Sequence, residues 1–323
     1  MLPCFDAVSI FLNMTILEAL FPIVFIAFLA WCAAYWEFLS ESETRTFEKI
    51  AFNFFVPCML FYGTATADLP AVLDWDLLLG YYLGIFSIYL AGILIGVFFY
   101  GRNLPKLAAF GMGCAYPNAV VLGIPICLEL LGDEAFVPIF MVVAIHNLLI
   151  FSFGIIVAEM QKEEGKAIGA HVWGVAKGLF KNPISGSLLL GAAINFSGIP
   201  VYQSVMDSME LLGRAGVPAA VLALGAGLNR YAIRGEIPKA VLVTLIKLLV
   251  QPALVWFFTG VVFEMDFLLV QTAVLLSCMP VGISVYVFTI RYRCLEDLAA
   301  TSIVMSCILS IISITLFAYL LGV

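Results

Sequence analysis

The feature that most constrains this chain is a series of apolar segments, each of about the length needed to cross a bilayer as a helix. A spanning helix takes about 20 predominantly apolar residues. Because the segments are separated by short polar connections, the sequence predicts an all-α membrane protein with ten transmembrane helices. The segments are 13–36, 46–64, 75–99, 105–131, 135–158, 183–199, 203–229, 238–262, 267–290 and 298–321.

Composition excludes a soluble fold. Charged residues make up 11% of the 323 residues, hydrophobic residues make up 63%, and the mean hydropathy is +1.11. A soluble domain has about 25% charged residues, and it cannot hide this much apolar surface from water. The net charge of −7 also argues against a nucleic-acid partner, because phosphate binding requires a basic surface.

Motifs for catalysis and for metal binding are missing from the sequence. The eight cysteines form no CxxC pair, so we expect neither a disulfide nor a metal site. No HExxH, GxSxG or GxxxxGK[ST] motif occurs, which argues against a zinc protease, a serine hydrolase and an ATP-driven pump. We therefore expect a protein that is not an enzyme and has no cofactor.

The basic residues predict the orientation. Thirteen of the 15 Lys and Arg residues lie in every second connection or at its edge, and the other connections have none. Basic connections stay in the cytoplasm, so this alternation predicts ten crossings with both termini extracytoplasmic, in a bacterial-type inner or plasma membrane. The longest connection, 159–182, is then a cytoplasmic linker, either plain or carrying a short helix on the membrane surface.

Prolines at matching places indicate an internal repeat. Pro57 precedes Pro218 by 161 residues, and Pro117 precedes Pro280 by 163. These offsets divide the chain into a first five-helix unit (1–158), the linker 159–182 and a second unit (183–323). Because five is odd, the second unit is inverted, an architecture typical of secondary transporters.

All four prolines fall near the middle of the bilayer, about 12 to 15 residues into their segments at 1.5 Å per residue. Proline bars a regular helix, and freed backbone groups are tolerated at that depth only when they are buried in protein or face a watery cavity. We therefore expect helix breaks at Pro57, Pro117, Pro218 and Pro280 that serve a binding site.

Four motifs complete a family resemblance. PNAVVLGIPI, KNPISGSLLLGAAI, GRAGVPAAVLALGAGL and MPVGISVYVF resemble the auxin efflux carrier family, which includes plant auxin exporters and bacterial carriers of malonate, malate and similar carboxylates. The resemblance covers residues 14–321. It implies crossed broken helices 4 and 9, a scaffold of helices 1, 2, 6 and 7, a moving domain of helices 3–5 and 8–10, an elevator-type mechanism and a homodimer.

The resemblance also implies site residues. Asn118 matches a substrate ligand of the plant carriers, and we expect main-chain N–H groups after Pro117 and Pro280 to assist it. Asn182 matches an asparagine near the site, and Lys247 falls where relatives often have a basic residue. The full expected substrate-binding set is Pro117, Asn118, Gly123, Pro125, Asn182, Lys247, Pro280, Val281 and Gly282.

Other polar residues inside the segments leave alternatives open. His146 and Asn147 lie mid-membrane and fit either proton coupling and substrate contact or plain hydrogen bonding. Lys247 fits a cavity-lining cation, one that snorkels to the nearby cytoplasmic face, or one that pairs with a carbonyl. Arg214 lies four residues after Glu210, so it fits either a local ion pair or a ligand-binding role.

The sequence therefore predicts a secondary transporter of a small organic anion, a mono- or dicarboxylate that is auxin-like or malonate-like. Half-helix N-termini at the breaks suit an anion because they carry partial positive charge and free N–H donors. The alternative is a membrane sensor that binds a lipid or metabolite without transport. H⁺, Na⁺ or neither remains open as the coupling ion, and membrane lipid is an expected partner.

Overall fold

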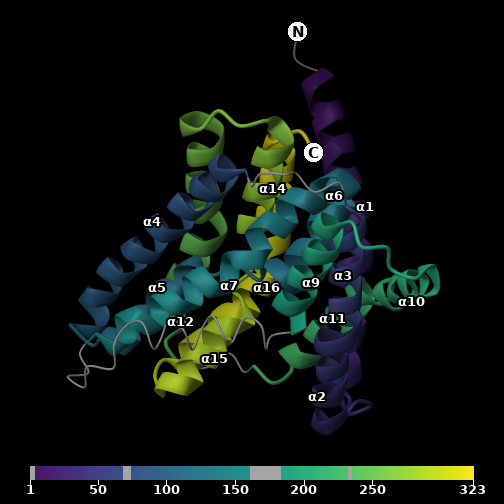
Figure 1. The fold of residues 1–323 in the computed structure, drawn as a ribbon. Helices are drawn as coiled ribbons and strands as arrows, with labels where there is room; N and C mark the ends of the chain where they lie inside the picture. The colour runs from purple at the N-terminus through teal and green to yellow at the C-terminus, as the bar shows by residue number, and fades with distance from the viewer. Residues whose placement is uncertain (1–3, 68–73, 161–182, 232–234) are drawn as a thin grey trace.

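A computed structural model describes residues 4–67, 74–160, 183–231 and 235–323 (Figure 1). Regular structure in these ranges is helical, with one isolated antiparallel bridge between Pro117 and Val281. The first half contains α1 (Cys4–Tyr35), α2 (Glu41–Ile50), α3 (Val56–Thr66), α4 (Trp75–Tyr100), α5 (Leu104–Ala115), α6 (Ile124–Leu131) and α7 (Phe136–Glu159). The second half contains α9 (Pro183–Ser197), α10 (Gln203–Gly213), α11 (Gly216–Leu228), α12 (Ile237–Leu245), α13 (Gln251–Trp256), α14 (Phe267–Ser277), α15 (Ile283–Tyr292) and α16 (Glu296–Leu320).

The lengths of these helices fit a membrane protein. Among the described residues, five helical stretches are long and apolar enough to span a bilayer: Trp75–Tyr100, Asp133–Glu159, Gln203–Leu228, Ile237–Val262 and Glu296–Leu320. Shorter apolar helices lie over Phe21–Tyr35, Ala119–Leu131, Gly186–Ser197 and Phe267–Ser277. The expectation of an all-helical membrane protein is confirmed at this level.

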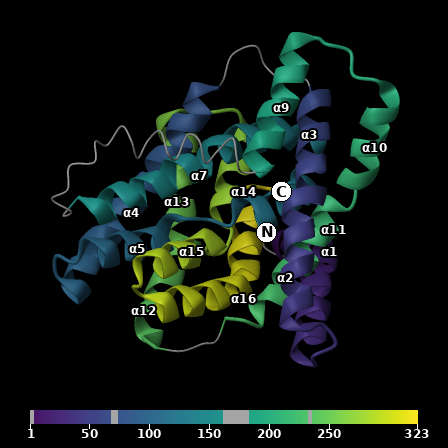
Figure 2. The same ribbon diagram turned by 60° about the horizontal axis from the view of Figure 1, so that its bottom comes forward.

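The helices form two groups in space. In Figures 1 and 2, α1, α2, α3, α9, α10 and α11 stand together on the right, whereas α4, α5, α12, α13 and α15 fill the left. Within the right-hand group α3 packs on α9 and α1 packs on α11, and within the left-hand group α4 packs on both α5 and α13. Helices α7 and α14 lie between the groups.

Small residues allow the closest of these contacts. A Cβ on Gly225 of α11 would lie 2.1 Å from the carbonyl oxygen of Ala27 on α1. Likewise, a Cβ on Gly92 of α4 would lie 2.8 Å from Cα of Gly111 on α5. Membrane helices associate through packing rather than through exclusion of water, so backbones that approach this closely are a main source of stability.

The four prolines interrupt their helices to different degrees. At Pro117 and Pro280 helical structure stops, between α5 and the helix over Ala119–Leu131 and between α14 and α15. At Pro57 the expected break is wrong: α2 runs into α3 through the π-helical turn Ala51–Phe55. A widened turn accommodates a proline without ending the helix.

At Pro218 the break lies a few residues upstream of the proline. The chain turns between Gly213 and Gly216, and Pro218 lies in the first turn of α11, where its missing N–H is not needed. Its side chain is exposed. The expected cytoplasmic linker falls almost entirely outside the described residues.

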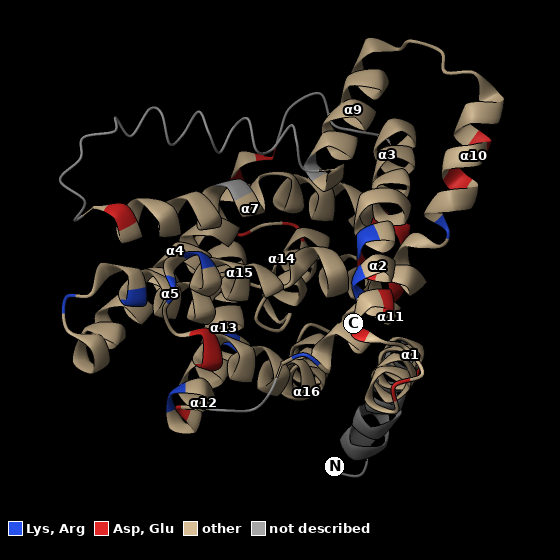
Figure 3. Cartoon of the chain, turned by 90° about the horizontal axis from the view of Figure 1, so that it is seen from below, with Lys and Arg blue, Asp and Glu red and all other residues tan. Residues whose placement is uncertain are grey.

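Charged residues are sparse along the helices. Seen from below, most of the ribbon is uncharged, and coloured residues gather near α2, at α12 and at helix ends (Figure 3). Large apolar side chains point outward from many helices, among them Phe98, Leu94 and Ile312. An apolar exterior of this kind is the surface that a lipid environment requires.

Candidate functional site

The two interrupted helices meet at their breaks. The main-chain N–H of Asn118 donates to the carbonyl of Pro280 at 2.8 Å, and the N–H of Gly282 donates to the carbonyl of Tyr116 at 2.9 Å. These bonds form the antiparallel bridge between Pro117 and Val281. We call the paired segments 116–118 and 280–282 the crossing. Each break thus satisfies backbone groups that the other leaves unbonded.

Two half-helices, α5 and α14, end at the crossing. Side chains of a single helix, formed by α12, a π-helical turn and α13, bond to the last carbonyl of each. The Lys247 side chain donates from Nζ to the carbonyl of Ser277, the last residue of α14, at 2.7 Å. One turn later, Gln251 donates from Nε2 to the carbonyl of Ala115, the last residue of α5, at 3.0 Å. Both side chains are fully buried. A cation at a helix C-terminus also compensates the negative end of the helix dipole.

A cavity of about 290 Å³ opens on the crossing. Asn118 lines it, is 6% exposed, and has no hydrogen-bond partner for its Nδ2 donor. A buried amide donor without a partner costs roughly 1–3 kcal/mol, which a bound acceptor would recover. The residues that line the cavity are Glu48, Phe52, Tyr116, Pro117, Asn118, Ala119, Val120, Val121, Val143, His146, Asn147, Ile184, Ala223, Leu224, Gly227, Arg230, Tyr231, Gly282, Ile283 and Ser284.

The first turns of the two departing half-helices also face this cavity. Residues 119–121 begin the helix over Ala119–Leu131, and residues 283–284 begin α15. No side chain caps either helix start. Two helix N-termini and a side-chain amide donor therefore converge on one space, an arrangement that favours an anion.

Helix α7 contributes polar groups next to Asn118. His146 and Asn147 both line the cavity. The hydroxyl of Tyr116 donates to Oδ1 of Asn147 at 2.7 Å, which fixes the Tyr116 ring, and that ring lies 5.0 Å from the ring of His146. His146 is buried, and neither of its ring nitrogens has a hydrogen-bond partner. This histidine is thus available to a ligand.

The other expected site residues that the structure describes do not line the cavity. Gly123 and Pro125 are buried in the second half of helix 4, where a Cβ on Gly123 would lie 2.9 Å from Leu276 of α14, so this glycine serves packing. Val281 is buried, and its N–H donates to Ser306. Pro280 takes part through its carbonyl alone. Asn182 lies outside the described residues.

Two charged residues in the cavity wall were missed as site candidates. Glu48 of α2 and Arg230, which follows α11, form an ion pair there. In the sequence Arg230 serves only as an orientation signal, and nothing marks it as a neighbour of a residue 182 positions earlier. Arg214, by contrast, pairs with Glu210 at 2.7 Å with its side chain 74% exposed, which fits the local ion pair.

Among the residues that the structure describes, no group of three or more His, Cys, Asp or Glu could hold a metal ion. Seven described cysteines are free. The cavity therefore offers hydrogen-bond donors and one ion pair.

Apolar helices of spanning length, with buried polar groups in a cavity between them, define an integral membrane protein. The chain belongs to the auxin efflux carrier family of membrane transport proteins, whose sequence profile matches residues 15–318. An uncharacterized transporter of Methanothermobacter thermautotrophicus is 26% identical over 287 residues, covering 88% of this chain and 91% of the relative. A candidate malonate transporter of Rhizobium meliloti is 25% identical over 230 residues, covering 70% of this chain and 71% of the relative.

Proposed function

We propose that this membrane transport protein is a secondary transporter of a small organic anion that carries a carboxylate. The observation that carries the proposal is the unpartnered Nδ2 of Asn118, buried in a cavity on which two helix N-termini converge. A carboxylate accepts hydrogen bonds from an amide and from main-chain N–H groups, so it fits this set of donors. The malonate assignment of the Rhizobium relative supports the same substrate class.

We propose further that the crossing moves with its half-helices. In this mechanism helices 3–5 and 8–10 carry the substrate past a scaffold of helices 1, 2, 6 and 7, in a homodimer. The lining of the cavity supports this division, because Glu48 and Arg230 belong to the proposed scaffold and Asn118 and His146 to the proposed moving domain. H⁺ coupling through His146, Na⁺ coupling and uniport are the outcomes that flux measurements distinguish.

The proposed topology is ten helices in two inverted five-helix units, with both termini extracytoplasmic. The basic connections support it, because they alternate with connections that have no Lys or Arg. Labelling of a single cysteine in a C-terminal tag by an impermeant reagent tests it. The tag should react in intact cells. A tag that reacts only after the membrane has been permeabilised lies in the cytoplasm, and this result would contradict the even number of crossings or their orientation.

Flux tests the function directly. Purified protein is reconstituted in proteoliposomes and offered labelled mono- and dicarboxylates, malonate among them, with protein-free liposomes as the control. We expect saturable uptake of at least one carboxylate and a thermal shift with the same compound. A thermal shift without flux favours the alternative, a membrane sensor built on the same fold.

A further inference from the structure

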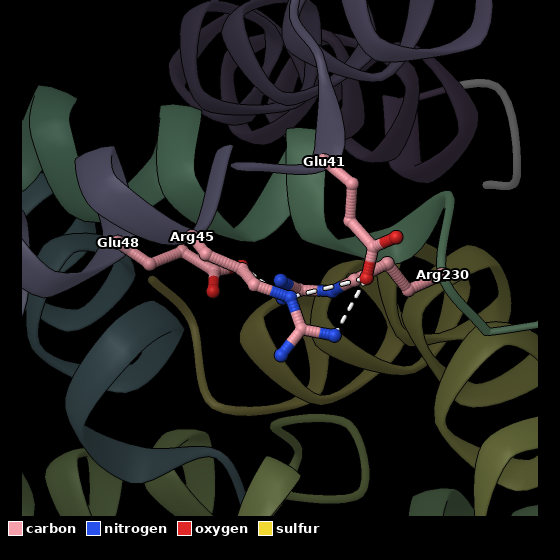
Figure 4. A network of polar contacts seen from close by, with 4 residues as sticks. All are labelled: Glu41, Arg45, Glu48 and Arg230. Carbon is pink, nitrogen blue, oxygen red and sulfur yellow. Dashed lines mark hydrogen bonds and ion pairs between the residues drawn. The ribbon is translucent and has the colours of Figure 1, made fainter. Parts of the chain in front are cut away.

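The ion pair in the cavity wall joins α2 to the residues that follow α11. Arg230 donates from Nη2 to Oε1 of Glu48, and each side chain is 23% exposed (Figure 4). Three other ion pairs, Glu41–Arg45, Glu210–Arg214 and Glu236–Lys239, each join residues three or four positions apart. The Glu48–Arg230 pair is therefore set by tertiary structure and depends on the relative placement of α2 and α11.

The chain makes room for this contact. A Cβ on Gly227 of α11 would lie 2.4 Å from Oε1 of Glu48 and 3.0 Å from Nη2 of Arg230. Both distances are shorter than or at the limit of real Cβ contacts. Gly227 leaves open the space that the ends of these two side chains occupy.

Arg230 is the basic side chain that lines the cavity, because the nearby Arg45 is paired with Glu41 outside it. Arg45 bonds Glu41 through both Nε (3.0 Å) and Nη2 (2.6 Å), and this bond lowers the pKa of the Glu41 carboxyl (Figure 4). Neither residue lines the cavity at the crossing. Glu41 instead lines a second cavity, of about 270 Å³, together with Arg230. The Arg230 side chain thus forms part of the wall between two cavities.

We propose that Glu48 occupies, in the empty protein, the place of a substrate carboxylate on Arg230, and that the incoming anion displaces it. Arg230 is then a substrate ligand, and Glu48 is a residue that sets affinity. This inference rests on the proposed function. A guanidinium presents five N–H donors in a planar fork, so it exchanges one carboxylate for another with little change in geometry.

The charges in the cavity wall give a physical reason for this exchange of Glu48 for a substrate carboxylate on Arg230. With Glu48 in place the cavity wall is electrically neutral, so Arg230 is stabilised while no substrate is present. A partly buried guanidinium without a carboxylate partner would hold another anion or would bear an uncompensated desolvation cost. An intramolecular competitor lowers substrate affinity, and this favours release on the far side of the membrane.

Binding measurements on the purified full-length protein test the proposal. The probe is malonate, or the carboxylate of the panel that binds the wild type most tightly. Glu48→Gln should tighten binding roughly fivefold or more, and Arg230→Gln should weaken it roughly tenfold or more, the size of one charge-assisted hydrogen bond. The double variant should behave like Arg230→Gln. The matched control is Glu210→Gln, which also breaks an ion pair but does not line the cavity, and it should stay within about twofold of the wild type.

Two results overturn the proposal while the proposed function stands. The first is unchanged or weaker binding by Glu48→Gln, which would make Glu48 a mere support for Arg230. The second is wild-type affinity in Arg230→Gln. If Glu48→Gln does not fold, Glu48→Asp is measured with the same expectation, because its carboxylate is one methylene short of Arg230. A wild type that neither binds nor transports any carboxylate overturns the proposed function itself.

Discussion

The two interrupted helices look equivalent in the sequence, but their breaks are chemically different. Asn118 follows the first proline and brings an unpartnered side-chain donor into the cavity, whereas Val281 follows the second proline and is buried with its N–H bonded to Ser306. The carbonyl end is capped by a neutral amide at the first break and by an ammonium group at the second. The first break thus presents the proposed binding group, and the second supports it.

In the proposed inverted repeat, the two matching breaks thus divide their tasks. Both breaks need their backbone groups satisfied, and each supplies one of the two hydrogen bonds across the crossing. Once the backbone is satisfied, a single polar side chain suffices for recognition. Placing that side chain in one half avoids a second buried donor that would have to find a partner.

Breaking the crossing itself should have the largest effect. A Cβ on Gly282 would lie 2.6 Å from the ring of Tyr116, which is held by Asn147, so Gly282→Val forces the paired segments apart. We expect loss of flux and a loss of stability of about 1–3 kcal/mol, the usual cost of overpacking. Thermal unfolding and proteoliposome uptake measure both.

Gly260→Ala is the matched control for that experiment. Its Cβ would lie 3.4 Å from the nearest atom, an ordinary contact, so it should leave flux and stability unchanged or slightly improved. Wild-type flux in Gly282→Val would show that the bond between the two breaks is dispensable.

Asn118→Ala should have the next largest effect, and it tests the asymmetry directly. Loss of one hydrogen bond to a charged group costs about 1.5–3 kcal/mol, or roughly a 10- to 150-fold weaker Kd. Val281→Ala, the same position in the other break, should change Kd by less than about threefold, since no polar group is lost. Equal effects of the two substitutions, measured by calorimetry, would refute the division of tasks.

Replacing the two capping side chains, Gln251 and Lys247, should change the free energy of unfolding by smaller and unequal amounts. Gln251→Met leaves the Ala115 carbonyl unbonded and should cost about 1–2 kcal/mol, although it also removes the unpartnered Oε1. Lys247→Met leaves the Ser277 carbonyl unbonded as well, but it relieves the larger cost of a buried cation, so it should cost less than about 1 kcal/mol.

Substrate affinity distinguishes the two capping residues, Lys247 and Gln251, from the proposed binding residue Asn118. Because neither Lys247 nor Gln251 lines the cavity, both variants should lower the transport rate more than they weaken Kd. A greater loss of thermal stability in Lys247→Met than in Gln251→Met would mean that the charge itself stabilises α14. A tenfold weaker Kd in Lys247→Met would place the lysine in the site.

The smallest effect is expected outside both breaks, at Arg214. Its exposed ion pair with Glu210 is worth about 0–1 kcal/mol. Arg214→Ala should therefore leave Kd and flux within about twofold of the wild type and shift thermal unfolding only slightly. Loss of binding in this variant would restore Arg214 as a ligand.

The sequence by itself determined the class of fold and the place of two of the four expected breaks. Apolar segment length predicts helices, and the prolines at 117 and 280 mark where two helices stop, because proline removes a donor and bars the helical backbone whatever surrounds it. The same local logic was insufficient at Pro57, where a π turn absorbs the strain. Asn118 could be singled out because it follows one of these prolines and matches a family ligand.

Only the tertiary structure decided which polar groups face one another. Lys247 caps a carbonyl 30 residues away, and Arg230 meets Glu48 across 182 positions, contacts that no local pattern encodes. Charge, period and proline position are properties of a segment, whereas a cavity is made by segments that meet in space. The site therefore follows from the packing of helices, because that packing determines which buried donor lacks a partner and which cation already has one.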